Sequence, residues 1–89
     1  MINKNLSLDG LIFKATKIDN SNNILTITLN RPEKKNALNN VMIDEINYAL
    51  AYAKQERSVR VVVIAAEGDI FCAGADLNRT ESDSNVPKI

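Results

Sequence analysis

The chain has 89 residues and carries 11 basic and 11 acidic side chains, so its formal net charge is zero. This charge balance and an aromatic content of 4% argue against nucleic-acid binding, which needs a basic surface and rings for base stacking. The 89 residues include no histidine and one cysteine, which excludes a Ser-His-Asp triad, a Cys-His pair and an internal disulfide among them. We therefore expect one domain at most, no metal site and a reducing, cytoplasmic location.

The first predicted element is an antiparallel β-hairpin. Residues 1–10 are polar and are expected to form a tail, whereas residues 11–18 partly alternate between apolar and polar, as in a half-buried strand. The Asn-rich cluster at 19–23 is typical of a turn. Residues 24–30 are rich in β-branched side chains and form the second strand. Pro32 then ends the ladder because it has no N–H to donate.

The next element is an amphipathic helix. It is predicted to begin with Asn39 or Asn40 as its N-cap and to continue to Arg57, because no glycine or proline interrupts residues 41–57. Helical spacing places several apolar side chains on one face, which should pack against the sheet. These side chains are Met42, Ile46, Ala49, Leu50 and Ala53.

The continuous apolar run at 61–65 predicts a strand covered on both faces, as in a parallel sheet beneath helices. Even when extended to residue 66, this run is much too short to cross a bilayer, so we expect no membrane association. A strand, a helix and a second strand make a β-α-β crossover, which is right-handed in nearly all proteins. The fold class is therefore α/β.

The segment FCAGADL, residues 71–77, follows this strand and has little side-chain chemistry. Gly74 lies between two alanines, so the main chain is almost bare and its N–H groups could bind an anion or an oxyanion. On local residues alone, a simple tight turn of small side chains is the favoured alternative. Asp76 could cap a helix beginning near Leu77 or could bind a ligand. Cys72 is interpreted as a small buried hydrophobe.

In their order and spacing, these segments resemble the enoyl-CoA hydratase/isomerase family, also called the crotonase family. The resemblance extends from about residue 11 to about residue 78 and implies the N-terminal part of the crotonase ββα spiral: a β-hairpin, a helix, a buried strand and an oxyanion turn. Residues 79–89 are polar and contain one proline, so we expect a disordered tail there. The blocks that carry the resemblance are ILTITLNRP (24–32), KNAL (35–38), VRVVVI (59–64) and FCAGADL (71–77).

The resemblance implies a role for the main chain of this last block. Ala75 matches the family residue whose backbone N–H binds the thioester oxygen of an acyl-CoA. No separate cofactor is implied, because the substrate carries the CoA, and homo-oligomers, often built from trimers, are common in the family. The residues expected to line the CoA path, mostly through backbone atoms, are Lys35, Ala37, Ala73, Asp76 and Leu77.

The family's second oxyanion donor and its catalytic glutamates belong to later blocks that have no match in these 89 residues. The resemblance therefore implies the N-terminal portion of an enoyl-CoA hydratase that is inactive as the 89-residue chain. Two alternatives stay open. The parent reaction could be enoyl-CoA isomerisation or another acyl-CoA reaction of the family, or the chain could be a non-catalytic CoA-binding or assembly module.

Overall fold

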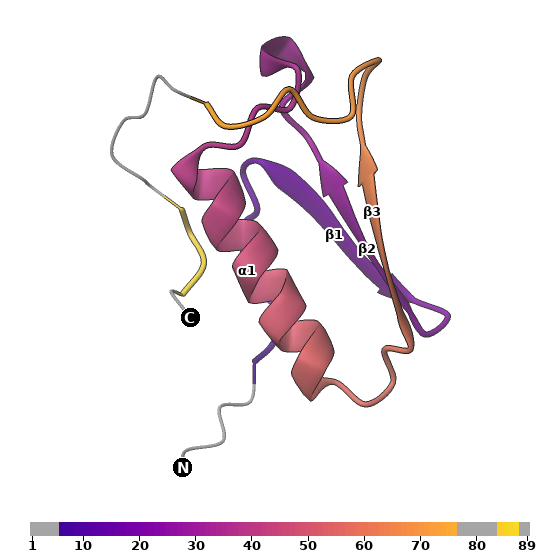
Figure 1. The fold of residues 1–89 in the computed structure, drawn as a ribbon. Helices are drawn as coiled ribbons and strands as arrows, with labels where there is room; N and C mark the ends of the chain where they lie inside the picture. The colour runs from indigo at the N-terminus through magenta and orange to yellow at the C-terminus, as the bar shows by residue number, and fades with distance from the viewer. Residues whose placement is uncertain (1–5, 77–83, 88–89) are drawn as a thin grey trace.

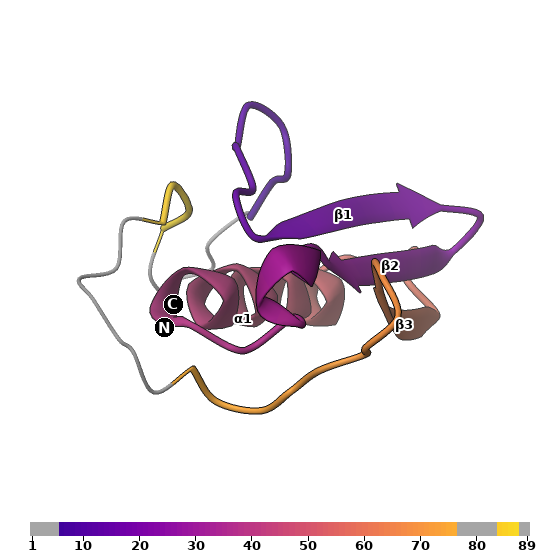
Figure 2. The ribbon, with the colours of Figure 1, turned by 90° about the horizontal axis from the view of Figure 1, so that it is seen from above.

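The computed structural model describes residues 6–76 and 84–87. A three-stranded sheet carries one α-helix on one face (Figures 1 and 2). The strands lie in the order β1 (Thr16–Ser21), β2 (Ile24–Leu29) and β3 (Val61–Ala66), with β1 antiparallel and β3 parallel to the central β2. The 3-10 helix η1 (Pro32–Lys34) and the α-helix α1 (Asn40–Gln55) form the connection from β2 to β3. This confirms the predicted α/β class and the crossover.

The hairpin begins later and turns more tightly than the sequence predicts. The predicted strand over 11–18 is wrong, because β1 runs from Thr16 to Ser21 and Ser21 pairs directly with Ile24. Only Asn22 and Asn23 form the turn, with φ of 55° and 67°. Positive φ at both central positions suits the twist of a two-residue hairpin, and asparagine tolerates it. The polar side chains just before the turn therefore belong to an edge strand.

Helix α1 confirms the predicted helix and its N-cap. The Asn39 side-chain oxygen accepts a hydrogen bond from the Met42 N–H at 2.9 Å. The helix ends at Gln55, two residues before the predicted end at Arg57, because Glu56 already has extended backbone with ψ of 110°. In the part of the chain that the structure describes, no helix is long and apolar enough to span a bilayer.

The buried face of α1 differs from the predicted apolar stripe. Met42 and Ala49 are fully buried as expected, but Leu50 is 41% exposed. Glu45 and Tyr48 are buried on this face instead. The central strand supplies the opposing side of the core through Leu25, Ile27 and Leu29, each at most 2% exposed.

Glu45 is a fully buried carboxylate that binds the segment entering β1. It accepts hydrogen bonds from the backbone N–H groups of Lys14 and Ala15 at 2.6 and 2.9 Å and from the Thr16 hydroxyl at 2.8 Å. These three donors make the burial of a charged group tolerable. Glu45 therefore joins the middle of α1 to the start of the sheet.

The prediction that β3 is covered on both faces is wrong. The side chains of residues 61–64 are 38–51% exposed. β3 is an edge strand, and α1 packs over β1 and β2 rather than over β3 (Figure 2). An apolar run indicates that a strand can be buried, but it does not say which element of the fold covers it.

The two segments predicted as tails both include residues that contact α1. The Tyr48 hydroxyl donates to the Ser7 carbonyl at 2.7 Å and accepts from the Ser7 N–H at 3.2 Å. Near the other end of the chain, the Ser84 hydroxyl donates to the Asp44 carboxylate at 2.9 Å, and Val86 is buried. Parts of both predicted tails thus pack on the helix.

Asn36 connects the end of β2 to the end of β3. It is fully buried and adopts a φ of 56°. Its side-chain oxygen accepts from the Arg31 N–H at 2.7 Å, and its amide nitrogen donates to the carbonyls of Glu67 and Ile70, both at 2.8 Å. One side chain therefore fixes the turn that leads from β3 into the FCAGADL segment.

The Glu45→Ala substitution should lower the free energy of unfolding by about 3 kcal/mol, because it leaves several donors at the start of β1 without their acceptor. Urea unfolding followed by circular dichroism measures the change. Glu33→Ala is the matched control, since Glu33 is exposed on η1 and its loss should cost less than about 0.5 kcal/mol. Equal effects of the two substitutions would contradict the role given to Glu45.

The Asn36→Gly substitution should cost about 2–3 kcal/mol, because glycine accepts the positive φ but makes none of the three side-chain hydrogen bonds. Asn22→Gly is the control, because Asn22 has a similar φ of 55° and is exposed. Its effect should stay within about 0.5 kcal/mol. If both variants unfold at the same urea concentration, the Asn36 side chain does not fix the turn.

Candidate functional site

The candidate site lies where two segments run side by side beyond the end of the sheet (Figure 1). One is the loop 35–38 after β2, and the other is the segment 73–76 after β3. Because β2 and β3 are parallel neighbours, their carboxyl ends share one edge of the sheet, and the segments that leave them meet there. An isolated parallel bridge joins Leu38 to Ala75. The structure thus brings together residues that lie far apart in the sequence and that the sequence assigns to one site.

The bridge fixes the direction of the Ala75 N–H. The Leu38 N–H donates to the Gly74 carbonyl, and the Asp76 N–H donates to the Leu38 carbonyl, both at 2.8 Å. In a parallel pair bonded in this way, the residue between these two groups directs its own N–H and C=O to the other side. Ala75 is exposed, and no residue in the described ranges 6–76 and 84–87 accepts its N–H.

Gly74 makes the change of chain direction before the bridge possible. Its φ is 108°, which side chains other than glycine rarely adopt, although a Cβ would meet no atom within 4 Å. Glycine is therefore required by the backbone conformation and not by space. The Gly74 N–H lies 3.4 Å from the Cys72 sulfur, and Cys72 packs against the core around Met42 while remaining partly exposed.

Asp76 forms a shielded ion pair with Arg31. The Arg31 Nη2 lies 3.3 Å from the Asp76 Oδ2, and the two side chains are 14% and 18% exposed. The Arg31 Nη1 also donates to the Ala37 carbonyl. The sequence left helix capping and ligand binding open for Asp76 and gave no role to Arg31, whose partner lies 45 residues away. Arg31 belongs to the ILTITLNRP block, and this was the signal in the sequence that could have identified Arg31 as a candidate site residue.

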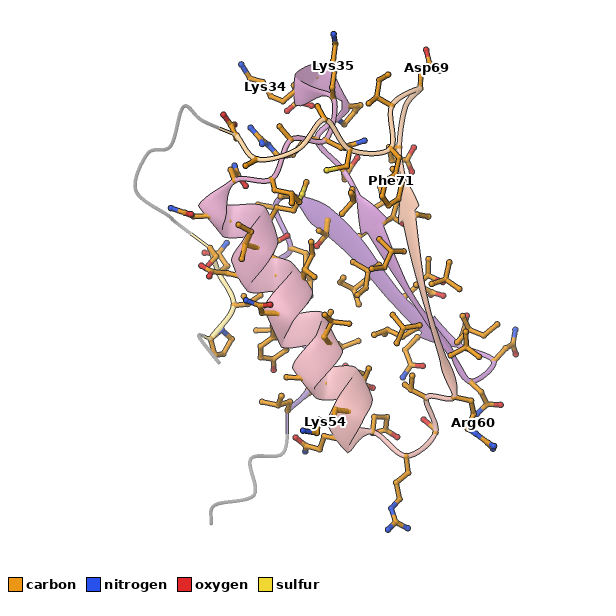
Figure 3. The ribbon with its side chains drawn as sticks, viewed as in Figure 1. Lys34, Lys35, Lys54, Arg60, Asp69 and Phe71 are labelled. Atoms are coloured by element: carbon orange, nitrogen blue, oxygen red, sulfur yellow. The ribbon has the colours of Figure 1, made fainter. Side chains whose placement is uncertain are left out.

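The other predicted CoA-lining residues occupy the two walls of this site. Ala73 is exposed and its N–H donates to the Lys35 carbonyl at 3.0 Å, which extends the contact between the segments. The Ala37 N–H donates to the Lys34 carbonyl at 3.0 Å. The Lys35 side chain projects outward beyond the sheet (Figure 3). Leu77 lies outside the described residues, and contact of any of these residues with CoA stays a prediction.

A pocket of about 340 Å³ adjoins the Lys35 side of the site. Gly68 lies on its floor, where a Cβ would come within 3.0 Å of the Pro32 Cβ, so the two turns touch closely there. Within the described residues, no group of three or more His, Cys, Asp or Glu side chains could hold a metal ion. The residues that line the pocket are Pro32, Lys35, Glu67, Gly68, Asp69 and Ile70.

Comparison with known sequences identifies the family of the chain. The family model described as enoyl-CoA hydratase/isomerase matches residues 19–87. The chain is 42% identical over 73 residues to the probable enoyl-CoA hydratase echA6 of Mycobacterium leprae, a match that covers 79% of this chain and 30% of that protein. It is 34% identical over 64 residues to the 1,2-epoxyphenylacetyl-CoA isomerase of Escherichia coli, covering 72% of this chain and 24% of that protein.

Solved structures agree with this assignment. An enoyl-CoA hydratase/isomerase from Pseudoalteromonas atlantica superposes with a TM-score of 0.73 at 35% identity, covering 83% of this chain and 30% of that one. The enoyl-CoA hydratase EchA8_6 from Mycobacterium marinum gives a TM-score of 0.69 at 41% identity, covering 72% of this chain and 30% of that one. The chain therefore spans less than a third of the length of these relatives. The chain belongs to the enoyl-CoA hydratase/isomerase family, and it corresponds to the N-terminal portion of the family domain.

Proposed function

We propose that the Ala75 N–H is one donor of an oxyanion hole that binds the thioester oxygen of a 2-enoyl-CoA, in an enzyme that hydrates the double bond. The observation that carries the proposal is the direction of this N–H, which the Leu38 bridge turns away from the neighbouring loop. A substrate oxygen could approach the N–H to about 2.9 Å without breaking a hydrogen bond among the described residues.

The chemistry of hydration explains why a main-chain donor suffices at this position. The oxygen of water bonds to the β-carbon, a proton is added to the α-carbon, and in between electron density collects on the thioester oxygen as an enolate. An N–H directed at that oxygen stabilises the developing charge, and one such donor contributes about 3 kcal/mol to the lowering of the barrier. The small methyl group of Ala75 leaves room for the thioester.

Isomerisation of the double bond is the second candidate, because one of the relatives is named a trans-2-decenoyl-[acyl-carrier-protein] isomerase. A proton then leaves one carbon and returns to another, and the same enolate oxygen carries the charge. The proposed role of Ala75 is identical in both reactions. The choice between hydration and isomerisation depends on the acid and base groups that move the proton. The nearby carboxylates of Asp76 and Glu67 are in ion pairs with Arg31 and Lys17, so we assign neither of them this role.

We further propose that the 89-residue chain binds the thioester without turning it over. In this proposal the walls at Lys35, Ala37, Ala73 and Asp76 follow the CoA moiety, with Lys35 available to the phosphates. The substrate brings its own CoA, so no separate cofactor takes part. A homo-oligomeric assembly and a cytoplasmic location complete the proposal, and both rest on the resemblance and on composition.

Titration of the ¹⁵N-labelled chain with crotonyl-CoA tests the role of Ala75 by NMR. The Ala75 amide proton should shift downfield, because it gains a carbonyl acceptor, whereas free CoA, which has no thioester oxygen, should leave it unchanged. Amides of loop 35–38 should respond to both ligands. The proposal fails if crotonyl-CoA binds and shifts these loop amides but leaves the Ala75 amide where it was. If neither ligand shifts any amide signal, the proposed CoA site is refuted.

A further inference from the structure

We propose that Arg31 is a positioning residue for the Ala75 N–H, which it holds in the orientation that faces a ligand. This inference rests on the function proposed for Ala75. Arg31 does not touch the expected place of the thioester oxygen. It acts on the two segments that form the bridge, from the side of the site where the ion pair with Asp76 lies.

The guanidinium group binds both segments that form the bridge, at a residue adjacent to each bridge partner. Its Nη1 donates to the carbonyl of Ala37, the residue before Leu38, and its Nη2 lies 3.3 Å from the carboxylate of Asp76, the residue after Ala75. The planar fork of arginine suits two acceptors at fixed positions, which a lysine ammonium cannot match in the same geometry. Arg31 is therefore a clamp across the bridge.

The bridge needs such a clamp because it is isolated. It contains two backbone hydrogen bonds, a third joins Ala73 to Lys35 at the start of the two segments, and no strand of the sheet flanks it among the described residues. A backbone hydrogen bond makes only a modest net contribution to stability. The Arg31–Asp76 pair is largely shielded from solvent, so salt and water screen it less than an exposed pair.

The clamp also selects the register. Along an extended segment, successive N–H groups point to opposite sides, so a slip of one residue would turn the Ala75 N–H toward the loop. The contact of the Asp76 carboxylate with the guanidinium favours the observed register, because a slip would move the carboxylate along the segment. Arg31 is itself fixed at the end of β2, since its N–H donates to the Asn36 side chain at 2.7 Å and its carbonyl accepts from the Asn36 N–H at 2.8 Å.

Arg31 has a second effect that is electrostatic. Asp76 is adjacent to Ala75, so its carboxylate charge would repel the negative charge that collects on an enolate oxygen. The guanidinium compensates that charge. Loss of Arg31 should therefore weaken binding of a thioester oxygen through both orientation and charge, whereas free CoA, which lacks this oxygen, should be affected much less.

The test compares Arg31→Lys, Asp76→Asn and their combination with the unsubstituted ¹⁵N-labelled chain, using crotonyl-CoA and free CoA as ligands. Arg57→Lys is the matched control, because Arg57 is exposed. Arg31→Lys should weaken crotonyl-CoA binding about tenfold and reduce the downfield shift of the Ala75 amide, because it removes the fork that holds both segments. Asp76→Asn should reduce the same shift, but its effect on crotonyl-CoA affinity should be smaller, because it also removes the carboxylate charge next to Ala75. Free CoA affinity should change by less than about twofold in Arg31→Lys, and the double variant should be little worse than Arg31→Lys alone.

If Arg31 had a purely structural role, its substitution would weaken the binding of crotonyl-CoA and of free CoA by the same factor. An unchanged ratio of the two affinities therefore overturns the inference. The inference about Arg31 is also overturned if crotonyl-CoA shifts the Ala75 amide of the unsubstituted chain and shifts it fully in both variants. That result would leave the role of Ala75 intact. Absence of the shift in the unsubstituted chain instead refutes the proposed function. Amide signals of β1 and β2 report folding, and their collapse in both variants would make the pair a determinant of the fold and not a positioning device.

Discussion

The parallel bridge between Leu38 and Ala75 is the contact on which the candidate site depends. It exists because β2 and β3 are parallel neighbours, so that the segments leaving their carboxyl ends emerge from one edge of the sheet. The alternation of N–H groups along an extended segment then leaves the Ala75 N–H on the open side. The direction of one donor thus follows from the topology of the sheet.

Polar side chains support this main-chain site from behind. Asn36 holds the turn that leads out of β3, and Arg31 binds both of the segments that the bridge joins. The groups that would face a ligand are an N–H and small side chains, whereas the groups that fix their position are long and polar. Under the proposed function, this division explains why FCAGADL carries so little side-chain chemistry in this chain.

Features with a local cause could be predicted from the sequence. The cap at Asn39 and the turn around Gly74 depend on residues close in the chain, and the crossover follows from the order of the elements. Features that depend on distant partners could not. The partners of Glu45 and Arg31 lie 29–31 and 45 residues away, and the exposure of β3 depends on where α1 packs. The tight turn at Asn22 and Asn23 was hidden because residues 19–21 are of types that favour turns, and only their pairing with β2 makes them part of a strand.

The most direct test of the central claim observes the thioester carbonyl itself. Infrared difference spectra of crotonyl-CoA labelled with ¹³C at the carbonyl would be recorded with the unsubstituted chain and with Ala75→Pro, which has no N–H at this position. The account predicts a lower carbonyl stretching frequency on binding to the unsubstituted chain and a return toward the free value with Ala75→Pro. Equal frequencies for the ligand bound to the two chains would contradict it.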